Sequence, residues 1–136
     1  MSGILVDTNI VLDIVTADSN WLAWSLSALE SSESPFINPI IYSELCTNAT
    51  STGELDALLA NFGIQLREIP RQGLFLAAKA HQIYRSRGGT RTTGLPDFFI
   101  GAHAQALGVN ILTRDPGRFT TYFPSVALVV PPLANW

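Results

Sequence analysis

Short apolar runs alternate with longer amphipathic segments along the whole chain. Five of the runs have the length and β-branched or aromatic composition of strands, at residues 4–6, 35–38, 64–69, 109–113 and 126–130. Between them, the apolar spacing predicts helices over residues 10–15, 20–29, 39–45, 52–62, 72–84 and 96–107. Such an alternation, without repeats or a linker, predicts one α/β domain around a parallel sheet of four or five strands.

Turn and capping residues bound these elements. Ser19 or Asn20 is expected to cap the second helix, and Pro39 and Pro96 suit the first turns of two others. Residues 85–94 are polar, basic and rich in glycine, which predicts a loop between the last two helices.

The composition narrows the class of protein. Of the 136 residues, 47% are hydrophobic and only 14% charged, so much of the surface is expected to be uncharged or covered by a partner. No apolar run is long enough to span a bilayer, and no basic residue precedes the first apolar segment, as it would in a signal peptide. The single cysteine, Cys46, excludes an internal disulfide and is expected to be buried. We therefore expect a cytoplasmic protein with a single domain over residues 1–136.

The net charge of −3 hides an asymmetry between the two halves of the chain. The first 66 residues contain eight acids and no base, whereas the remainder contains all eight basic residues against three acids. This division favours an acidic centre that binds a cation, beside a basic surface that binds an anion.

Four acids are expected at the carboxyl edge of the sheet, where open α/β folds bind their ligands. Asp7 ends the first strand, Glu44 lies on the helix after the second, Asp97 begins a helix, and Asp115 follows the strand at 109–113. Each alone is compatible with capping or turn chemistry. Together they would repel strongly, by about 4 kcal/mol for each pair about 4 Å apart, unless a cation lay between them. Oxygen ligands without His or Cys favour Mg²⁺ or Mn²⁺.

The same segments resemble a known family. Asp7-Thr8-Asn9 after an apolar strand, Glu44 in a helix, Leu95-Pro96-Asp97-Phe98-Phe99-Ile100 and Leu112-Thr113-Arg114-Asp115 are similar to those of the PIN-domain ribonucleases. Within that family the chain looks most like the VapC-type toxins of type II toxin–antitoxin pairs. The resemblance covers essentially the whole chain, and it implies a three-layer α/β/α fold with a central parallel sheet of four to five strands.

The resemblance also implies the chemistry of the site. It makes Asp7, Glu44, Asp97 and Asp115 the metal-binding acids, with the hydroxyl groups of Thr8 and Thr113 beside them. A metal-activated water would then hydrolyse an RNA phosphodiester, leaving a 5′-phosphate and a 3′-hydroxyl. Many relatives carry a further acid beyond the fourth, where this chain has Gly117-Arg118-Phe119. Asp115 is therefore the only candidate acid in that segment, and the pattern does not decide between one metal ion and two.

Positive charge near these acids indicates where RNA would lie. Arg85, Arg87 and Arg91 crowd the segment before Asp97, and Arg114 precedes Asp115. We expect these four arginines to contact RNA phosphates. The sequence does not identify the RNA as tRNA, rRNA or mRNA.

Other enzyme classes fit less well. A haloacid-dehalogenase-like phosphatase needs a second Asp where this chain has Asn9, and a response-regulator receiver needs a Lys after a late strand, whereas the only lysine, Lys79, falls in a helix. His81 and His103 lie on apolar helices and are interpreted as structural. The alternative that stays open is a catalytically inactive PIN-fold module that binds RNA or protein.

Assembly is expected on two grounds. The charged fraction is low, and Trp21 and Trp24 share one predicted helix, which favours a face that meets another chain. We expect a homodimer and a cognate antitoxin protein whose tail lies near these tryptophans. A basic side chain of that tail would enter the acidic pocket and displace the metal.

Overall fold

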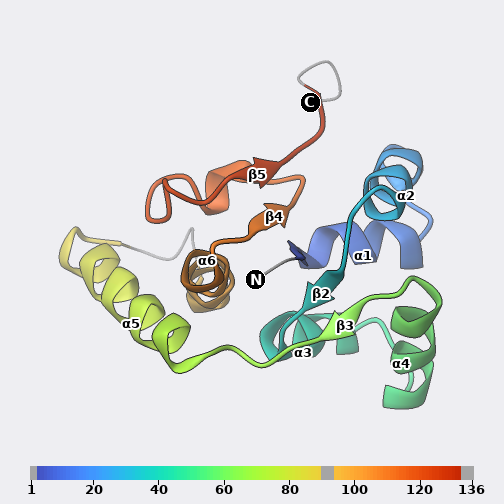
Figure 1. Ribbon diagram of the computed structural model, residues 1–136, viewed down its shortest axis with the longest axis horizontal. Helices are drawn as coiled ribbons and strands as arrows, with labels where there is room; N and C mark the ends of the chain where they lie inside the picture. The colour runs from blue at the N-terminus through green and yellow to red at the C-terminus, as the bar shows by residue number, and fades with distance from the viewer. Residues whose placement is uncertain (1–2, 90–93, 133–136) are drawn as a thin grey trace.

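The computed structural model describes residues 3–89 and 94–132, and its centre is a five-stranded sheet. The strands are β1 (Ile4–Val6), β2 (Pro35–Ile37), β3 (Gln65–Leu66), β4 (Asn110–Leu112) and β5 (Leu128–Val129). All neighbours are parallel, in the order β3-β2-β1-β4-β5 (Figure 1). The predicted parallel sheet of four to five strands is confirmed, and β1 is its central strand.

Helices flank this sheet, as expected for an α/β/α arrangement. They are α1 (Thr8–Val15), α2 (Leu22–Glu30), α3 (Pro39–Cys46), α4 (Thr52–Asn61), α5 (Arg71–Ser86), α6 (Leu95–Leu107) and the short 3-10 helix η1 (Pro116–Arg118). Helix α1 packs against α2 and α3, and α5 lies along α6 (Figure 1). Within residues 3–89 and 94–132, no helix is both long and apolar enough to cross a membrane.

The register places the site at one edge of the sheet. Ile4 of β1 is level with Pro35 of β2 and with Asn110 of β4, so the three strands end together. The residues that follow them, Asp7, Asn38 and Thr113, are completely buried. The interior behind them consists of apolar side chains, including Leu5, Phe36 and Ile111. Such a core fixes the strand ends, and therefore fixes the positions of the polar groups that follow them.

A second, smaller core joins α5 to α6. It is formed by Ala77, Tyr84, Phe98, Ala102 and Phe123. A Cβ added to Gly101 would meet the Phe123 ring at 2.2 Å, so the absence of a side chain at position 101 allows this ring to pack on α6. This packing holds α6, and with it Asp97 in its first turn.

Several element boundaries differ from those predicted. The strand expected at 64–69 is only Gln65–Leu66, because β3 is an exposed edge strand that pairs with β2 alone. Helix α2 is capped neither by Ser19 nor by Asn20. Asp18 accepts the amides of Asn20 and Trp21 instead, at 2.8 and 3.0 Å.

Two further expectations need correction. The loop predicted at 85–94 begins later, because α5 continues to Ser86 and so includes Arg85. Cys46 is exposed at the end of α3, so the expectation that it is buried was wrong. The position at the last helical turn directs this side chain away from the core that Ile41 and Leu45 enter from the same helix.

Candidate active site

Asp7 occupies the carboxyl end of the central strand and is 0% exposed. Its Oδ1 accepts the Thr8 amide at 2.8 Å, which caps α1, and its Oδ2 accepts the Thr113 hydroxyl at 2.7 Å. Burial raises the pKa of the Asp7 carboxyl above its usual value, and the charge of Arg118 and the donated hydrogen bonds oppose that rise. The local sequence therefore provides a buried carboxylate that needs positive charge beside it.

Asp97 comes from a distant part of the chain but lies close to Asp7. It is in the first turn of α6, where Pro96 precedes it and its backbone amide donates to the Gly94 carbonyl at 3.0 Å. Its side chain is mostly buried. The two acids lie at the same edge of the sheet, as predicted, and both form salt bridges with one side chain.

That partner is Arg118, at the end of η1. Its Nη1 donates to Asp7 Oδ2 at 2.6 Å, and its Nε donates to Asp97 Oδ1 at 2.9 Å. A further, very short hydrogen bond joins its Nη2 to the same Asp97 oxygen. Burial lowers the pKa of the Arg118 guanidinium, but the bonds and charges of Asp97 and Asp7 raise it by more, so the group stays protonated. Sequence reasoning did not assign a site role to Arg118; its position after a strand, near Asp115, was the available signal.

Glu44 and Asp115 are placed differently from this pair. Glu44 is half-buried on α3, and its Oε1 accepts the Thr8 hydroxyl at 2.6 Å. Asp115 is exposed before η1, and its backbone amide donates to Thr113 Oγ1 at 3.0 Å. In the parts of the chain that the structure describes, no three His, Cys, Asp or Glu side chains are close enough together to hold one metal ion. Asp7 and Asp97 are therefore brought together, whereas Glu44 and Asp115 connect to them through Thr8 and Thr113.

The two paired acids fit a hard divalent cation. Both present carboxylate oxygens to one cationic group, and oxygen is the ligand that Mg²⁺ and Mn²⁺ prefer. The carboxylates of Asp7 and Asp97 thus stabilise the positive charge of the Arg118 guanidinium that lies between them. Asp7 and Asp97 would hold the ion directly.

Arg114 forms an ion pair away from these acids. Its Nε and Nη2 donate to the two oxygens of Asp13 at 2.7 and 2.8 Å, and its guanidinium lies 4.9 Å from the Trp21 ring centroid. Asp13 is buried and also accepts the Ser25 hydroxyl at 2.6 Å. This geometry ties the segment after β4 to α1 and α2, and it commits two of the five guanidinium N–H groups of Arg114 to Asp13.

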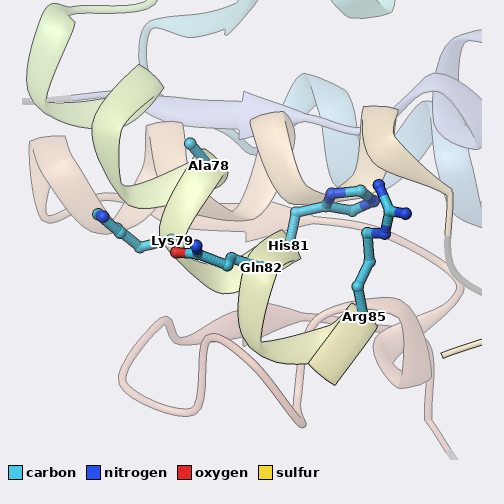
Figure 2. A pocket seen from close by; sticks show the side chains of 5 residues that line it. All are labelled: Ala78, Lys79, His81, Gln82 and Arg85. Carbon is cyan, nitrogen blue, oxygen red and sulfur yellow. The ribbon is translucent and has the colours of Figure 1, made fainter. Parts of the chain in front are cut away.

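A basic hollow of about 470 Å³ lies against α5. Its lining residues are Ala78, Lys79, His81, Gln82 and Arg85 (Figure 2). The His81 ring packs edge-on against Phe98, the residue after Asp97, with 5.2 Å between centroids. The hollow therefore borders the helix turn that carries an acid of the site. Arg87 is exposed just beyond α5, and Arg91 lies outside the described residues.

His103 is completely buried on α6, in agreement with its interpretation as structural. Its Nδ1 lies 3.2 Å from Asn38 Nδ2, and Asn38 Oδ1 accepts the Ile41 amide that begins α3. Because the Asn38 amide nitrogen can only donate, Nδ1 is the acceptor and the ring is neutral. Burial, with the charge of Arg67, lowers the pKa of His103 to about 4.

Comparison with known proteins identifies the family to which the chain belongs. A model of the PIN domain family matches residues 4–122, and the chain belongs to that family. No match is found among curated proteins.

Solved structures with the same fold include two VapBC complexes and one toxin–antitoxin complex. A chain of the DNA-bound VapBC complex from Salmonella typhimurium is 16% identical with a TM-score of 0.70, covering 96% of this chain and 98% of that one. VapBC2 from Rickettsia felis, bound to a promoter DNA fragment, gives 17% identity, a TM-score of 0.69 and coverages of 93% and 97%. A toxin–antitoxin complex from Klebsiella pneumoniae gives 23% identity, a TM-score of 0.68 and coverages of 95% of this chain and 98% of that one. At these identities the likeness defines the fold.

Proposed function

We propose that this PIN-domain protein is a Mg²⁺- or Mn²⁺-dependent endoribonuclease and the toxin of a toxin–antitoxin pair. The observation that carries the proposal is the convergence of Asp7 and Asp97 on a single positive charge at the carboxyl edge of a parallel sheet. These acids match the motif positions by which the sequence resembles VapC-type ribonucleases.

The residues around the acids have separable tasks. Asp7 and Asp97 hold the ion, and Thr113 orients Asp7 through the hydroxyl that it donates to Oδ2. Thr8 orients Glu44 in the same way, and Asp115 is positioned through Thr113. A bound divalent cation supplies an activated water and offsets the charge that develops on the phosphoryl oxygens. The protein contributes fixed positions and exclusion of bulk water on the Asp7 side.

RNA would approach along α5. Lys79 and Arg85 line the basic hollow, and no acid of residues 3–89 or 94–132 is among its lining residues. The contact of His81 with Phe98 places that hollow next to the turn that carries Asp97. Phosphates on one side of the cut would bind there, with Arg87 and Arg91 extending the positive charge along the chain.

The antitoxin and the homodimer belong to the same proposal. A solved complex with this fold joins a toxin to an antitoxin. The low charged fraction of this chain, 14%, favours the burial of surface against a partner or a second copy. A short partner protein encoded beside this gene, which co-purifies with the chain and suppresses its RNA cleavage, is the expected finding.

The direct test is RNA cleavage by the purified chain. Cleavage should require Mg²⁺ or Mn²⁺, and Asp97→Asn should lower its rate by at least about 10²-fold, as for loss of a main electrostatic contribution. Asp7→Asn should have a similar effect. The measurement is the initial rate of cleavage of a mixed tRNA and rRNA pool, with and without EDTA.

Glu30→Gln is the matched control, because Glu30 is an exposed acid at the end of α2, which leads into the start of β2 at the opposite edge of the sheet from both site acids. This variant should retain the wild-type rate. Full activity in EDTA, or in Asp97→Asn, would overturn the assignment of the site.

A second candidate is a catalytically inactive module that binds RNA or protein. It is favoured by the salt bridges of Arg118, which already occupy one oxygen of each acid. RNA binding without cleavage at any concentration of Mg²⁺ or Mn²⁺ would identify this second function.

A further inference from the structure

Arg118 uses the same oxygens that a metal ion would use. Its Nη1 lies 2.6 Å from Asp7 Oδ2, and its Nε lies 2.9 Å from Asp97 Oδ1. Mg²⁺ prefers carboxylate oxygens as ligands, so an ion held by these two atoms would have to replace the N–H groups that they now accept. The two positive charges would also repel each other. Arg118 and a bridging metal ion are therefore alternative occupants of one position.

The free protein has a reason to keep Arg118 there. Asp7 is completely buried, and Asp97 is mostly buried close to it. Two such carboxylates without a counter-charge would cost several kcal/mol in free energy of folding. The planar guanidinium contacts both with three N–H donors, which an ammonium group could not do in the same plane.

The position of Arg118 also allows the side chain to leave. It ends the three-residue helix η1, and about 20% of its side-chain surface is exposed. The next residue, Phe119, is completely buried and anchors the segment in the core. Rotation of the Arg118 side chain toward solvent would therefore vacate the acid pair without moving the strands or α6.

We propose that Arg118 is a built-in competitor for the metal site, which pairs with Asp7 and Asp97 until a divalent cation displaces its guanidinium. This inference rests on the proposed function, because it requires that a cation bind between the two acids. It makes Arg118 a positioning residue that keeps the carboxylates together before metal binding and sets the affinity of the site. A site that Arg118 occupies in nine molecules of ten binds metal about tenfold more weakly than the vacated site.

The first test measures metal binding without reference to activity. Mn²⁺ is titrated into the purified chain, and free Mn²⁺ is followed by electron paramagnetic resonance. Arg118→Gln should bind Mn²⁺ at least about tenfold more tightly than the wild type. Without metal, the variant should unfold at a lower temperature, and saturating Mn²⁺ should raise its unfolding temperature by more than it raises that of the wild type.

Arg114→Gln is the matched control. It breaks a partly buried Arg–Asp pair in the same segment, but the acid is Asp13, whose side chain bonds to Arg114 and Ser25 rather than to the residues of the acid pair. It should lose stability without any gain in Mn²⁺ affinity. An equal gain in both variants would overturn the proposal, because the effect would then come from loosening the segment.

A second measurement uses the wild-type protein, so it does not depend on how any variant folds. The Nε–H of Arg118 donates to a largely buried acid, so its proton should exchange slowly with water and give a resolved nitrogen–proton NMR signal. Addition of diamagnetic Mg²⁺ should abolish the slow exchange of this proton. The Mg²⁺ concentration at which half of the signal is lost should equal the concentration at which half of the sites are filled. A signal unchanged at saturating Mg²⁺ would overturn the proposal.

The outcomes separate this inference from the proposed function. Equal Mn²⁺ affinities of wild type and Arg118→Gln, both lost in Asp97→Asn, would overturn the competition and leave the metal site in place. Failure of wild type and Arg118→Gln alike to bind Mn²⁺ at millimolar concentration would overturn both.

Discussion

A carboxylate withdrawn from water, as Asp7 is, makes the stability of the fold depend on pH. Burial raises its pKa, so the folded protein releases this proton at higher pH than the unfolded chain does. Stability is therefore lost as pH rises from the unfolded pKa near 4 through the folded value. The charge of Arg118 reduces this loss but does not reverse the direction of the shift.

Replacing Asp7 by Asn should remove that loss, because an amide does not ionise. The Asn oxygen also keeps an acceptor for the Thr8 N–H. We expect Asp7→Asn to be at least as stable as the wild type at pH 7, with the advantage shrinking toward pH 4. Thermal unfolding of both proteins across this range is the measurement. A variant whose deficit grew from pH 4 to pH 7 would mean that the pair with Arg118 outweighs the cost of burial.

His103 titrates in the opposite sense. The folded protein holds it neutral, with a pKa of about 4, whereas the unfolded chain takes up a proton near the usual 6.5. Stability should fall as pH decreases from 6.5 to 4, by up to about 3 kcal/mol. Protonation at Nδ1 would also set two donors against each other at Asn38, which caps α3. His103→Gln, which keeps an acceptor for Asn38, should lose less stability by urea unfolding over this range. Equal losses in both proteins would exclude this role.

At the scale of elements, the segment from β4 through η1 carries most of the polar contacts of the site edge. Thr113 donates to Asp7, Arg114 pairs with Asp13, and Arg118 joins Asp7 to Asp97. The turn of η1 separates Arg114 from Arg118, so one short segment reaches Asp13 of α1 and Asp97 of α6 at once. A few residues outside regular structure therefore determine how two helices present their acids.

Helix α5 provides a separate test of the RNA path. Lys79→Ala combined with Arg85→Ala should weaken RNA binding and reduce the slope of log affinity against log salt by about 1.4, if each side chain neutralises one phosphate of a single strand. Filter binding at several salt concentrations is the measurement. Arg71→Ala, at the opposite end of α5, is the control and should keep the wild-type slope. If the double variant also kept it, RNA would follow another surface.

At the scale of the whole molecule, the sheet and its order of helices followed from the sequence because apolar runs and helical spacing are local signals. Asp7 and Asp97 were also predictable, since strand ends and helix starts in an α/β fold meet at one edge. The salt bridges of Arg118 were not, because they depend on where the chain after β4 places η1, 111 residues after Asp7 and 21 residues after Asp97. The Asp18 turn before α2 and the exposure of Cys46 depend on local rotations that periodicity does not resolve.

The low charged fraction of 14% leads to a prediction about assembly. We expect a homodimer in solution, and an antitoxin whose tail binds near Trp21 and Trp24, which are half-buried in the free chain. Sedimentation at micromolar concentration should give twice the mass of 14.7 kDa. Tryptophan fluorescence should shift to shorter wavelength when the antitoxin binds. A monomer whose fluorescence is unaffected by the partner would contradict both parts.

The central place of β1 in the sheet determines when the site can assemble during synthesis of the chain. Thr113 and Arg118 are synthesised 106 and 111 residues after Asp7, and Asp97 is made shortly before them. A growing chain on the ribosome therefore carries Asp7 for most of its synthesis without any of these partners. Contacts so distant in sequence form late, once the intervening chain has been released and can close the loop. If the chain cuts RNA as proposed, the message and the ribosome that produce it meet no assembled acid pair until Asp97 has emerged and packed beside Asp7.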